Sequence, residues 1–396
     1  MLEIREATEA DREEIALVDG LAFNYQADPA DVTVSGALCA CYRGRVVGSG
    51  YAIPMHQWFG GARVRCAGVA SVVVLPEFRG RGMARNLMAE LLARQRGAGD
   101  AVSVLYPANA SLYRQLGYEF AGLRPQFRAA MGDFPTGPKT GEGTVREMGE
   151  DDLPSLMACF SRFASRHSGP VEPAEPARWT DHVLAHKGEG MHQRTVVVPG
   201  DQGIDGYASY FLEARGENGY PLTCKHLVAL TPSALLPLLS YFRHFENSAK
   251  EVAWFGPPSG APVALALSST AFSLESRTWR WMGRVLDVPK ALEGRGYPIH
   301  ASGEVVVRIE DPLFPDNDGP WRLEVASGKC AVTRADALTA PESDDSLPVG
   351  LFSALYTGFV QTSDLIAMGA LGAGDERLSS LSAFFGGTVP WMPDFF

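Results

Sequence analysis

The chain has 396 residues, of which 46% are hydrophobic and 20% are charged, and its formal net charge is −11. This length predicts two or three domains, and the composition is that of a soluble globular protein. The acidic balance, without any lysine- or arginine-rich block, argues against a nucleic-acid binder and favours a cationic small molecule or amine as ligand.

The sequence contains no window that approaches the roughly 18 apolar residues of a membrane span, and residues 1–6 lack the features of a secretion signal. We therefore expect a cytoplasmic protein that does not bind membranes. The six cysteines form no CxxC pair and lie mostly in apolar, strand-like segments. This pattern is typical of reduced core thiols and predicts neither a metal site nor a disulfide framework.

Strands and helices alternate in the first part of the chain. Residues 2–5 predict a short strand, and a capping-box-like start at Thr8 leads into an amphipathic helix. A polar and aromatic loop at 23–29 follows this helix. Strands at 37–42 and 46–53 are then joined by a turn, which predicts a hairpin.

The stretch 69–82 organises this first region. A strand of β-branched and small apolar residues leads into the turn Arg79-Gly80-Arg81-Gly82, and a helical pattern occupies 83–92. Glycines in such a turn allow backbone N–H groups and the first helical turn to point at an anion, and the arginines add positive charge. The stretch predicts a pyrophosphate-binding turn, with a charged loop that binds nothing as the alternative.

A strand at 101–106 comes next, followed by a short helix from Pro107 to Gly117 and a return strand at 118–120. Gly117 is a natural left-handed helix terminator. An isolated tyrosine such as Tyr113 usually packs its helix against a sheet, but its position after a phosphate turn favours a chemical role. Tyr118 is expected in the core, and Asn109 is expected to cap the helix.

The basic glycine turn resembles the acetyl-CoA motif of the GNAT family of N-acetyltransferases, and residues 111–118 resemble the second signature of that family. The resemblance implies that acetyl-CoA enters where the strand carrying Val72 diverges from the strand at 101–106. Tyr113 would then lie near the sulfur and protonate the departing thiolate, which suits a phenol with an ordinary pKa of about 10. The implied cofactor-binding residues are Val72, Val73, Val74, Arg79, Gly80, Arg81 and Gly82.

Residues from 144 onward repeat the start of the chain. A strand, a helix, a hairpin at 195–211, and a further strand and helix follow in the same order. In this copy the basic glycine turn is replaced by residues 231–233, which include no glycine or arginine. We therefore expect no cofactor site there. We expect a linker at 131–143 between the copies. The identities that recur with the same spacing are Arg5 and Arg146, Glu6 and Glu147, Glu9 and Glu150, and Asp11 and Asp152.

A third region begins near residue 284. Residues 304–309 and 321–325 predict strands joined by a turn, and helical stretches follow at 349–359 and 363–371. The chain ends on several aromatic side chains, which an exposed tail seldom carries. We therefore expect the tail to be packed into the protein.

With regions at 1–135, 144–283 and 284–396, the whole chain resembles the Eis-like (enhanced intracellular survival) acetyltransferases. The resemblance implies an α/β (α+β) fold: tandem GNAT folds, with mixed sheets flanked by helices, plus a C-terminal sterol-carrier-protein-like α+β domain. It also implies a homo-oligomer, a hexamer, and places the terminal carboxylate of Phe396 in the active site as general base. The pKa of a free α-carboxylate is about 3.5, and enclosure among aromatic side chains would raise it. The alternative is a tail that only seals an interface.

The resemblance implies an acetyl-CoA-dependent N-acetyltransferase that acetylates aminoglycosides or polyamines by direct transfer, with Tyr113 as general acid and Phe396 as general base. A protein-lysine acetyltransferase and a non-catalytic protein that binds CoA or lipid are the alternatives. Some family members have an acidic residue before the terminal phenylalanine, but this chain has Phe395, which argues against multi-site binding of large polycations. The candidate residues for binding the amine are Phe23, Tyr25, Asp28, Ser71, Tyr106 and Asp394.

Overall fold

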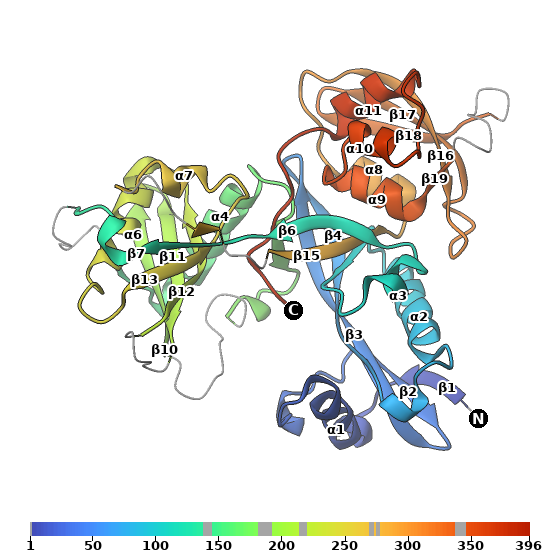
Figure 1. Cartoon of the computed structure of the whole chain (residues 1–396), viewed down its shortest axis with the longest axis horizontal. Helices are drawn as coiled ribbons and strands as arrows, with labels where there is room; N and C mark the ends of the chain where they lie inside the picture. Colours follow the sequence, from blue (N-terminus) through green and yellow to red (C-terminus); the bar gives the residue numbers. More distant parts are fainter. Residues whose placement is uncertain are drawn as a thin grey trace.

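The structure is a computed structural model that describes residues 2–137, 145–180, 192–213, 220–268, 273–274, 278–336 and 346–396. Two copies of one fold lie side by side, and a third domain packs against the first copy (Figure 1). All six cysteines are buried, as the sequence predicted. Among the helices of the described ranges, none has the length and apolar character needed to cross a bilayer.

The first copy is built on an eight-stranded sheet of order β1-β2-β3-β4-β5-β15-β6, with β9 paired to β3. Its neighbours pair antiparallel except for the parallel pair β4 and β5. The strands are β1 (Leu2–Glu6), β2 (Ala37–Tyr42), β3 (Arg45–Phe59), β4 (Ala62–Val74), β5 (Val102–Leu105), β6 (Glu119–Arg124), β9 (Val171–Pro173) and β15 (Trp279–Val285). The helices are η1 (Glu9–Asp11), α1 (Arg12–Phe23), η2 (Pro29–Asp31), η3 (Pro76–Phe78), α2 (Met83–Gly97) and α3 (Ala110–Arg114).

The second copy has a seven-stranded sheet of order β14-β7-β13-β12-β11-β10-β8. The strands are β7 (Gln126–Ala130), β8 (Arg146–Glu147), β10 (His192–Gly200), β11 (Gly203–Leu212), β12 (Leu222–Ala229), β13 (Glu251–Phe255) and β14 (Ser273–Leu274). The helices are η4 (Met131–Asp133), η5 (Glu150–Asp152), α4 (Leu153–Ala164), α6 (Pro232–Arg243) and α7 (Ala261–Ala264).

One ion pair shows that the two copies repeat each other in detail. Arg5 Nη2 donates to Asp11 Oδ1 at 2.7 Å, and Arg146 Nη2 donates to Asp152 Oδ1 at 2.7 Å. In both copies the aspartate also accepts a backbone N–H from the residue three positions before it, which fixes the entry into the first helix. The predicted repeat is thus confirmed, and it extends to the side chains that begin each helix.

The two sheets exchange strands. β7 follows β6 in the chain but pairs with β13 and β14 of the second sheet. In return, β15 lies between β5 and β6 of the first sheet (Figure 1). The boundaries drawn at 135 and 283 therefore follow the chain order, whereas the hydrogen bonds assign Gln126–Ala130 to the second sheet and Trp279–Val285 to the first.

The predicted linker is wrong at its first residues. Met131 and Phe134 are buried in the core of the second copy, where the Phe134 ring packs edge-on against Phe242 and Trp254. The apolar spacing of these two side chains places them on one side of η4, and burying that side outweighs the local turn signals. Residues 138–143 of the predicted linker lie outside the described residues.

The strands β3 and β4 are longer than the sequence pattern suggested. They form one hairpin that turns at Gly60 and Gly61, both with positive φ. Polar side chains interrupt the apolar alternation there, but β9 covers this part of β3 and its segment supplies partners. For example, Gln57 Nε2 donates to the carbonyl of Gly169 at 2.8 Å.

The C-terminal domain has a four-stranded sheet of order β18-β17-β16-β19. Its strands are β16 (Gly303–Glu310), β17 (Gly319–Ala326), β18 (Lys329–Arg334) and β19 (Leu347–Pro348), and its helices are α8 (Val288–Gly294), α9 (Val349–Thr357), α10 (Thr362–Ala367) and α11 (Arg377–Phe385). The predicted strands and helices are confirmed with small shifts at their ends. Its apolar core is continuous with that of the first copy, since Phe59 and Trp281 belong to the same cluster as Val307 and Phe352.

A buried ion pair joins the first sheet to the C-terminal domain. Arg284 on β15 donates to Asp311 Oδ1 at 2.8 Å, and both side chains are fully buried. Asp311→Ala leaves the arginine charge buried without its partner, so we expect the free energy of unfolding to fall by about 3–5 kcal/mol. Urea unfolding followed by circular dichroism measures the change.

The exposed pair of Glu90 and Arg94 on α2 provides the control for that substitution. Glu90→Gln should cost at most about 1 kcal/mol, because solvent screens an exposed pair. An equal decrease in the free energy of unfolding for the two variants would contradict a large contribution of the buried pair Arg284 and Asp311 to stability.

Candidate active site

The strands β4 and β5 separate partway along their length. Their parallel pairing covers Cys66, Ala67 and Gly68 of β4, and the last pair joins Gly68 to Val104. From that point to Val74, the described pairing of β4 is with β3 alone. The resulting opening lies where the sequence places the cofactor.

A bulge shapes β4 inside this opening. Gly50 of β3 faces two residues of β4, Ser71 and Val72, and Ser71 adopts a left-handed φ of 49°. The hydroxyl of Ser49, next to the bulge on β3, donates to Asp19 Oδ1 at 3.2 Å, and this carboxyl is buried on α1. Burial raises the pKa of Asp19 to about 6. Sequence reasoning missed Asp19, because an acidic residue on an amphipathic helix usually faces solvent.

The basic turn leaves room for an anion. Gly80 and Gly82 have φ values of 74° and 75°, and a Cβ atom on either would meet nothing within 4 Å. Gly82 is the N-cap of α2 without a side chain to occupy the first N–H groups of that helix. Arg79 Nε donates to the carbonyl of Val74 at 2.9 Å, which ties the turn to β4. The exposed arginine at position 81 adds charge beside it. These features fit a pyrophosphate.

The second copy closes the equivalent position. Thr231 caps α6, and its hydroxyl accepts the N–H of Ala234 at 3.2 Å. An N–H group in the first turn of α6 is therefore already hydrogen-bonded within the protein. The turn with two glycines and free N–H groups thus lies between β4 and α2, whereas its counterpart between β12 and α6 has a side-chain cap.

Tyr113 lies on α3 beside the opening, in one apolar cluster with Val72 and Leu105. Its side chain is 7% exposed, and burial raises its pKa. In the described part of the chain its hydroxyl makes no hydrogen bond, whereas the hydroxyl of Tyr118 lies 2.6 Å from that of Ser103. Tyr118 is a core residue as predicted, although it immediately precedes β6.

Asn109 caps α3 as predicted, since its side chain accepts the N–H of Ser111 at 3.0 Å. The helix therefore begins at Ala110 and not at Pro107. The asparagine side chain supplies the first acceptor for the free N–H groups and so fixes the start of the helix.

The C-terminal tail passes between the two copies (Figure 1). Leu123 of β6 donates its N–H to Pro390 at 3.0 Å and accepts one from Met392 at 3.1 Å, while Trp391 donates to Ser168 at 2.9 Å. Trp391 and Met392 are almost completely buried. The prediction of a packed tail is confirmed.

The last residue reaches the point where β4 and β5 separate. A Cβ atom at Gly68 would lie 2.7 Å from the ring of Phe396, so this ring packs directly on the glycine backbone. Tyr106 holds the same end of the tail: its hydroxyl donates to the carbonyl of Asp394 at 2.6 Å, and its ring meets the Phe396 ring edge-on at 5.7 Å. The end of the chain and the opening in the sheet therefore form one site.

The side chain of Asp394 is held by the second copy. Its Oδ1 lies 2.9 Å from Nε2 of His226, and both side chains are buried. The hydroxyl of Tyr207 lies 3.2 Å from the other ring nitrogen of His226. Lys225 and Arg124 also lie close to Asp394, and burial lowers the pKa of each. Sequence reasoning missed all four neighbours, because each is a single polar residue within a strand pattern.

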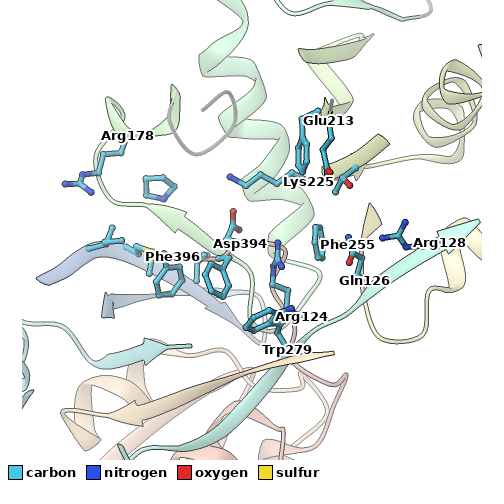
Figure 2. A pocket seen from close by; sticks show the side chains of 17 residues that line it. Arg124, Gln126, Arg128, Arg178, Glu213, Lys225, Phe255, Trp279, Asp394 and Phe396 are labelled. Atoms are coloured by element: carbon cyan, nitrogen blue, oxygen red, sulfur yellow. The ribbon is translucent and has the colours of Figure 1, made fainter. Parts of the chain in front are cut away.

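A cleft of about 820 Å³ opens above the tail (Figure 2). Both copies and the last three residues of the chain line it. The apolar side chains that line it include Ile53, Met55 and Phe396. The charged side chains that line it are Arg124, Arg128, Arg178, Lys225, Glu213 and Asp394.

The structure brings together only some of the residues predicted to bind the amine. Tyr106 contacts Asp394, and Ser71 lies in the opening of β4. Phe23, Tyr25 and Asp28 are exposed and are not among the residues that line the cleft. The carboxylate of Asp28 accepts the N–H of Ala30 at 2.8 Å and so caps η2.

Comparisons with known proteins agree with this architecture. Two families described as acetyltransferase (GNAT) domains match residues 3–121 and 174–285, and a sterol carrier protein domain family matches residues 288–393. An uncharacterized N-acetyltransferase of Streptomyces griseus is 26% identical over 85% of this chain and 83% of its own length. The N-acetyltransferase Eis of Mycobacterium tuberculosis is 26% identical over 82% of this chain and 79% of its own length. The crystal structure of a GCN5-related N-acetyltransferase from Anabaena variabilis superimposes with a TM-score of 0.89, at 25% identity and over all of both chains.

Proposed function

Because this chain belongs to the Eis-like family of GNAT N-acetyltransferases, we propose that it transfers the acetyl group of acetyl-CoA to a small-molecule primary amine bound in the cleft at its tail. The observation that carries the proposal is the contact between Phe396 and Gly68. Phe396 contacts β4 at the opening between β4 and β5 and also lines the cleft, so the end of the chain lies next to both.

Acetyl-CoA supplies the activated acetyl group. In the proposed mechanism, the turn from Arg79 to Gly82 binds its pyrophosphate through backbone N–H groups and arginine charge. The β4 backbone at Val72, Val73 and Val74 faces the pantetheine end and orients the thioester. The bulge at Ser71 sets the direction of these backbone groups, and Asp19 holds the neighbouring Ser49 of β3.

Two groups of the chain move the protons. The terminal carboxylate of Phe396 accepts a proton from the incoming ammonium, directly or through water, and Tyr113 donates a proton to the departing thiolate. Burial raises the pKa of Tyr113, so its phenol keeps its proton at neutral pH. Arg124 and Lys225 near the tail favour the neutral form of the amine, since a nearby positive charge lowers the pKa of an ammonium.

Turnover of a panel of amines tests the function. The purified chain is mixed with acetyl-CoA and with tobramycin, spermidine, a lysine-containing peptide or simple alkyl amines, and release of the CoA thiol is recorded. We expect release that depends on the amine. Release with the peptide alone would favour a protein-lysine acceptor, and binding of acetyl-CoA without release for any amine would favour a non-catalytic CoA-binding protein.

The glycine turn gives a prediction with a closely matched control. Gly82 and Gly44 have φ values of 75° and 80°, and a Cβ atom on either meets nothing within 4 Å of the protein. Gly82→Ala and Gly44→Ala should therefore carry the same backbone cost of about 1–2 kcal/mol. In the proposal only Gly82→Ala crowds the pyrophosphate, and we expect its Kd for acetyl-CoA to rise about 10- to 100-fold, or about 1.4–2.8 kcal/mol, in a calorimetric titration. An equal rise for Gly44→Ala would contradict the placement.

The same proposal includes the assembly and the compartment. By its resemblance to the family, the chain forms a homo-oligomer, a hexamer, and works in the cytoplasm, where acetyl-CoA is produced. Size-exclusion chromatography with light scattering tests the first part. A particle close to six times the chain mass of 42.7 kDa is expected, and the mass of a monomer would contradict it.

A further inference from the structure

One residue of the C-terminal tail is bound by both copies of the fold. The carbonyl of Asp394 accepts a hydrogen bond of 2.6 Å from the hydroxyl of Tyr106, which follows β5 of the first copy. The side chain of Asp394 contacts the second copy, since its Oδ1 lies 2.9 Å from Nε2 of His226 on β12. The tail is therefore fixed at position 394, two residues before the terminal carboxylate.

A chain of polar groups in the second copy orients His226. The hydroxyl of Tyr207 on β11 lies 3.2 Å from Nδ1 of the imidazole. When that hydroxyl donates to Nδ1, a neutral imidazole carries its proton on Nε2 and donates a hydrogen bond to Asp394. Phe160 of α4 stacks on the ring, with the centroids 5.8 Å apart and the planes at 22°. Both His226 and Tyr207 are almost completely buried, and a hydrogen bond is stronger in such an interior than in water.

Packing alone does not account for a buried carboxylate at this position. Asp394 is 3% exposed, and removing a carboxylate from water costs free energy that an apolar side chain would not cost. The carboxylate adds direction, because its hydrogen bond to His226 is formed only within a narrow range of distance and angle. The pair therefore fixes the tail more narrowly than an apolar contact would.

The fixed residue lies close enough to the chain end to control its position. Two residues span at most about 7 Å, so Asp394 confines the terminal carboxylate to a small region beside Gly68, on which the Phe396 ring packs. A general base must lie within hydrogen-bond reach of the proton that it removes. Because a displacement of about 1 Å can cost about 100-fold in rate, a residue that holds the tail affects the chemistry without touching the substrate.

We propose that His226, oriented by Tyr207, is a positioning residue for acetyl transfer: it holds Asp394 and thereby sets the place of the Phe396 carboxylate. The inference rests on the proposed function, in which that carboxylate is the general base. It also gives the second copy a part in the reaction. This copy has a side-chain cap where the first copy has the open glycine turn, and it contributes by holding the tail in the active site.

The first test removes the hydrogen bond and keeps an aromatic ring. His226→Phe retains a ring against Phe160 but cannot donate to Asp394. We expect kcat with a saturating amine to fall about 10- to 100-fold, whereas the KM for acetyl-CoA stays nearly unchanged, because the glycine turn belongs to the other copy. His226→Gln has an amide N–H group close to the position of Nε2, and it should recover kcat to within a few-fold of the wild type.

His167→Phe is the matched control. His167 also belongs to the second copy, and its ring meets the ring of Trp391 in the tail edge-on at 5.7 Å. Its Nδ1 bonds to the carbonyl of Phe163, and within the described ranges it makes no hydrogen bond to the tail. This variant should keep kcat within a few-fold of the wild type. An equal loss of kcat in His167→Phe and His226→Phe would overturn the inference, since any disturbance beside the tail would then suffice.

A double variant separates positioning from stability. His226→Phe leaves the buried carboxylate of Asp394 without its hydrogen bond to the imidazole, so part of its effect is on folding. Combining it with Asp394→Leu makes the contact apolar, which should restore the free energy of unfolding in urea but not kcat. Recovery of both quantities would show that any packed contact is enough and would overturn the inference.

Digestion from the C-terminus follows the tail without any turnover. A carboxypeptidase is added to each folded protein, and mass spectrometry records the loss of Phe396 and Phe395. We expect release about 10-fold faster in His226→Phe than in the wild type, in His226→Gln or in His167→Phe, because the lost hydrogen bond raises the population of the released tail. Equal rates would overturn the inference even where every protein acetylates amines. If the wild type acetylates no amine, the proposed function fails, and faster release in His226→Phe still supports the hold of His226 on the tail.

Discussion

Adding one glycine after Phe396 should reduce kcat about 10²- to 10⁴-fold, which is the usual contribution of a general base, with little effect on the affinity for acetyl-CoA. The tail is fixed up to its end: Arg124 and Tyr106 bind the carbonyls of Pro393 and Asp394, and the Phe396 ring packs on Gly68. An extra residue therefore moves the terminal carboxylate by about 3.5 Å while the rest of the tail keeps its contacts. Steady-state kinetics with a saturating amine measure the loss.

Phe396→Leu is the matched control for the extension. It keeps the terminal carboxylate at the same position in the chain and removes only ring contacts, including the edge-on contact with Tyr106 at 5.7 Å. We expect less than a 10-fold loss of kcat for this variant, because lost aromatic packing is worth about 1 kcal/mol. If the extended protein kept wild-type kcat, the carboxylate would not be the base, and the tail would serve only to seal the interface.

The parts of this site that follow one another in the chain were predictable from the sequence. The strand β4, the glycine turn after it and the helix α2 each have a local sequence signal: a run of β-branched residues, glycines that allow positive φ, and helical spacing of apolar residues. Each signal acts over a few residues. Tyr113 and its helix cap Asn109 were found in the same way. The aromatic ending predicted that the tail is buried, since apolar surface of that size is costly to expose.

The parts that the sequence could not place depend on pairing between distant strands. The strands β7 and β15 each join the sheet of the other copy. The alternation of apolar and polar residues shows that each is a strand, but it does not determine which sheet edge the strand pairs with. That exchange draws the two copies together, and only then do Arg124 of β6 and Lys225 of β12 face the same cleft.

Tyr113→Phe should lower kcat about 10²- to 10⁴-fold, because it removes the proposed general acid without changing the shape of the side chain. The hydroxyl makes no hydrogen bond in the described part of the chain, so its loss should change the free energy of unfolding by less than about 1 kcal/mol. Burial raises the pKa of Tyr113 above its ordinary value, so the phenol holds its proton throughout the neutral range. The loss in the variant should consequently be the same at every pH from about 6 to 9.

Tyr118→Phe separates chemistry from packing, because Tyr118 is also buried and its ring centroid lies 6.0 Å from that of Tyr113. Its hydroxyl bonds to that of Ser103 at 2.6 Å, so removing it should cost about 1 kcal/mol of stability and leave kcat within a few-fold of the wild type. The two variants thus predict opposite results: lost turnover with kept stability for Tyr113, and kept turnover with lost stability for Tyr118. Thiol-release assays and urea unfolding on both proteins measure this contrast, and full turnover in Tyr113→Phe would assign the proton to another donor.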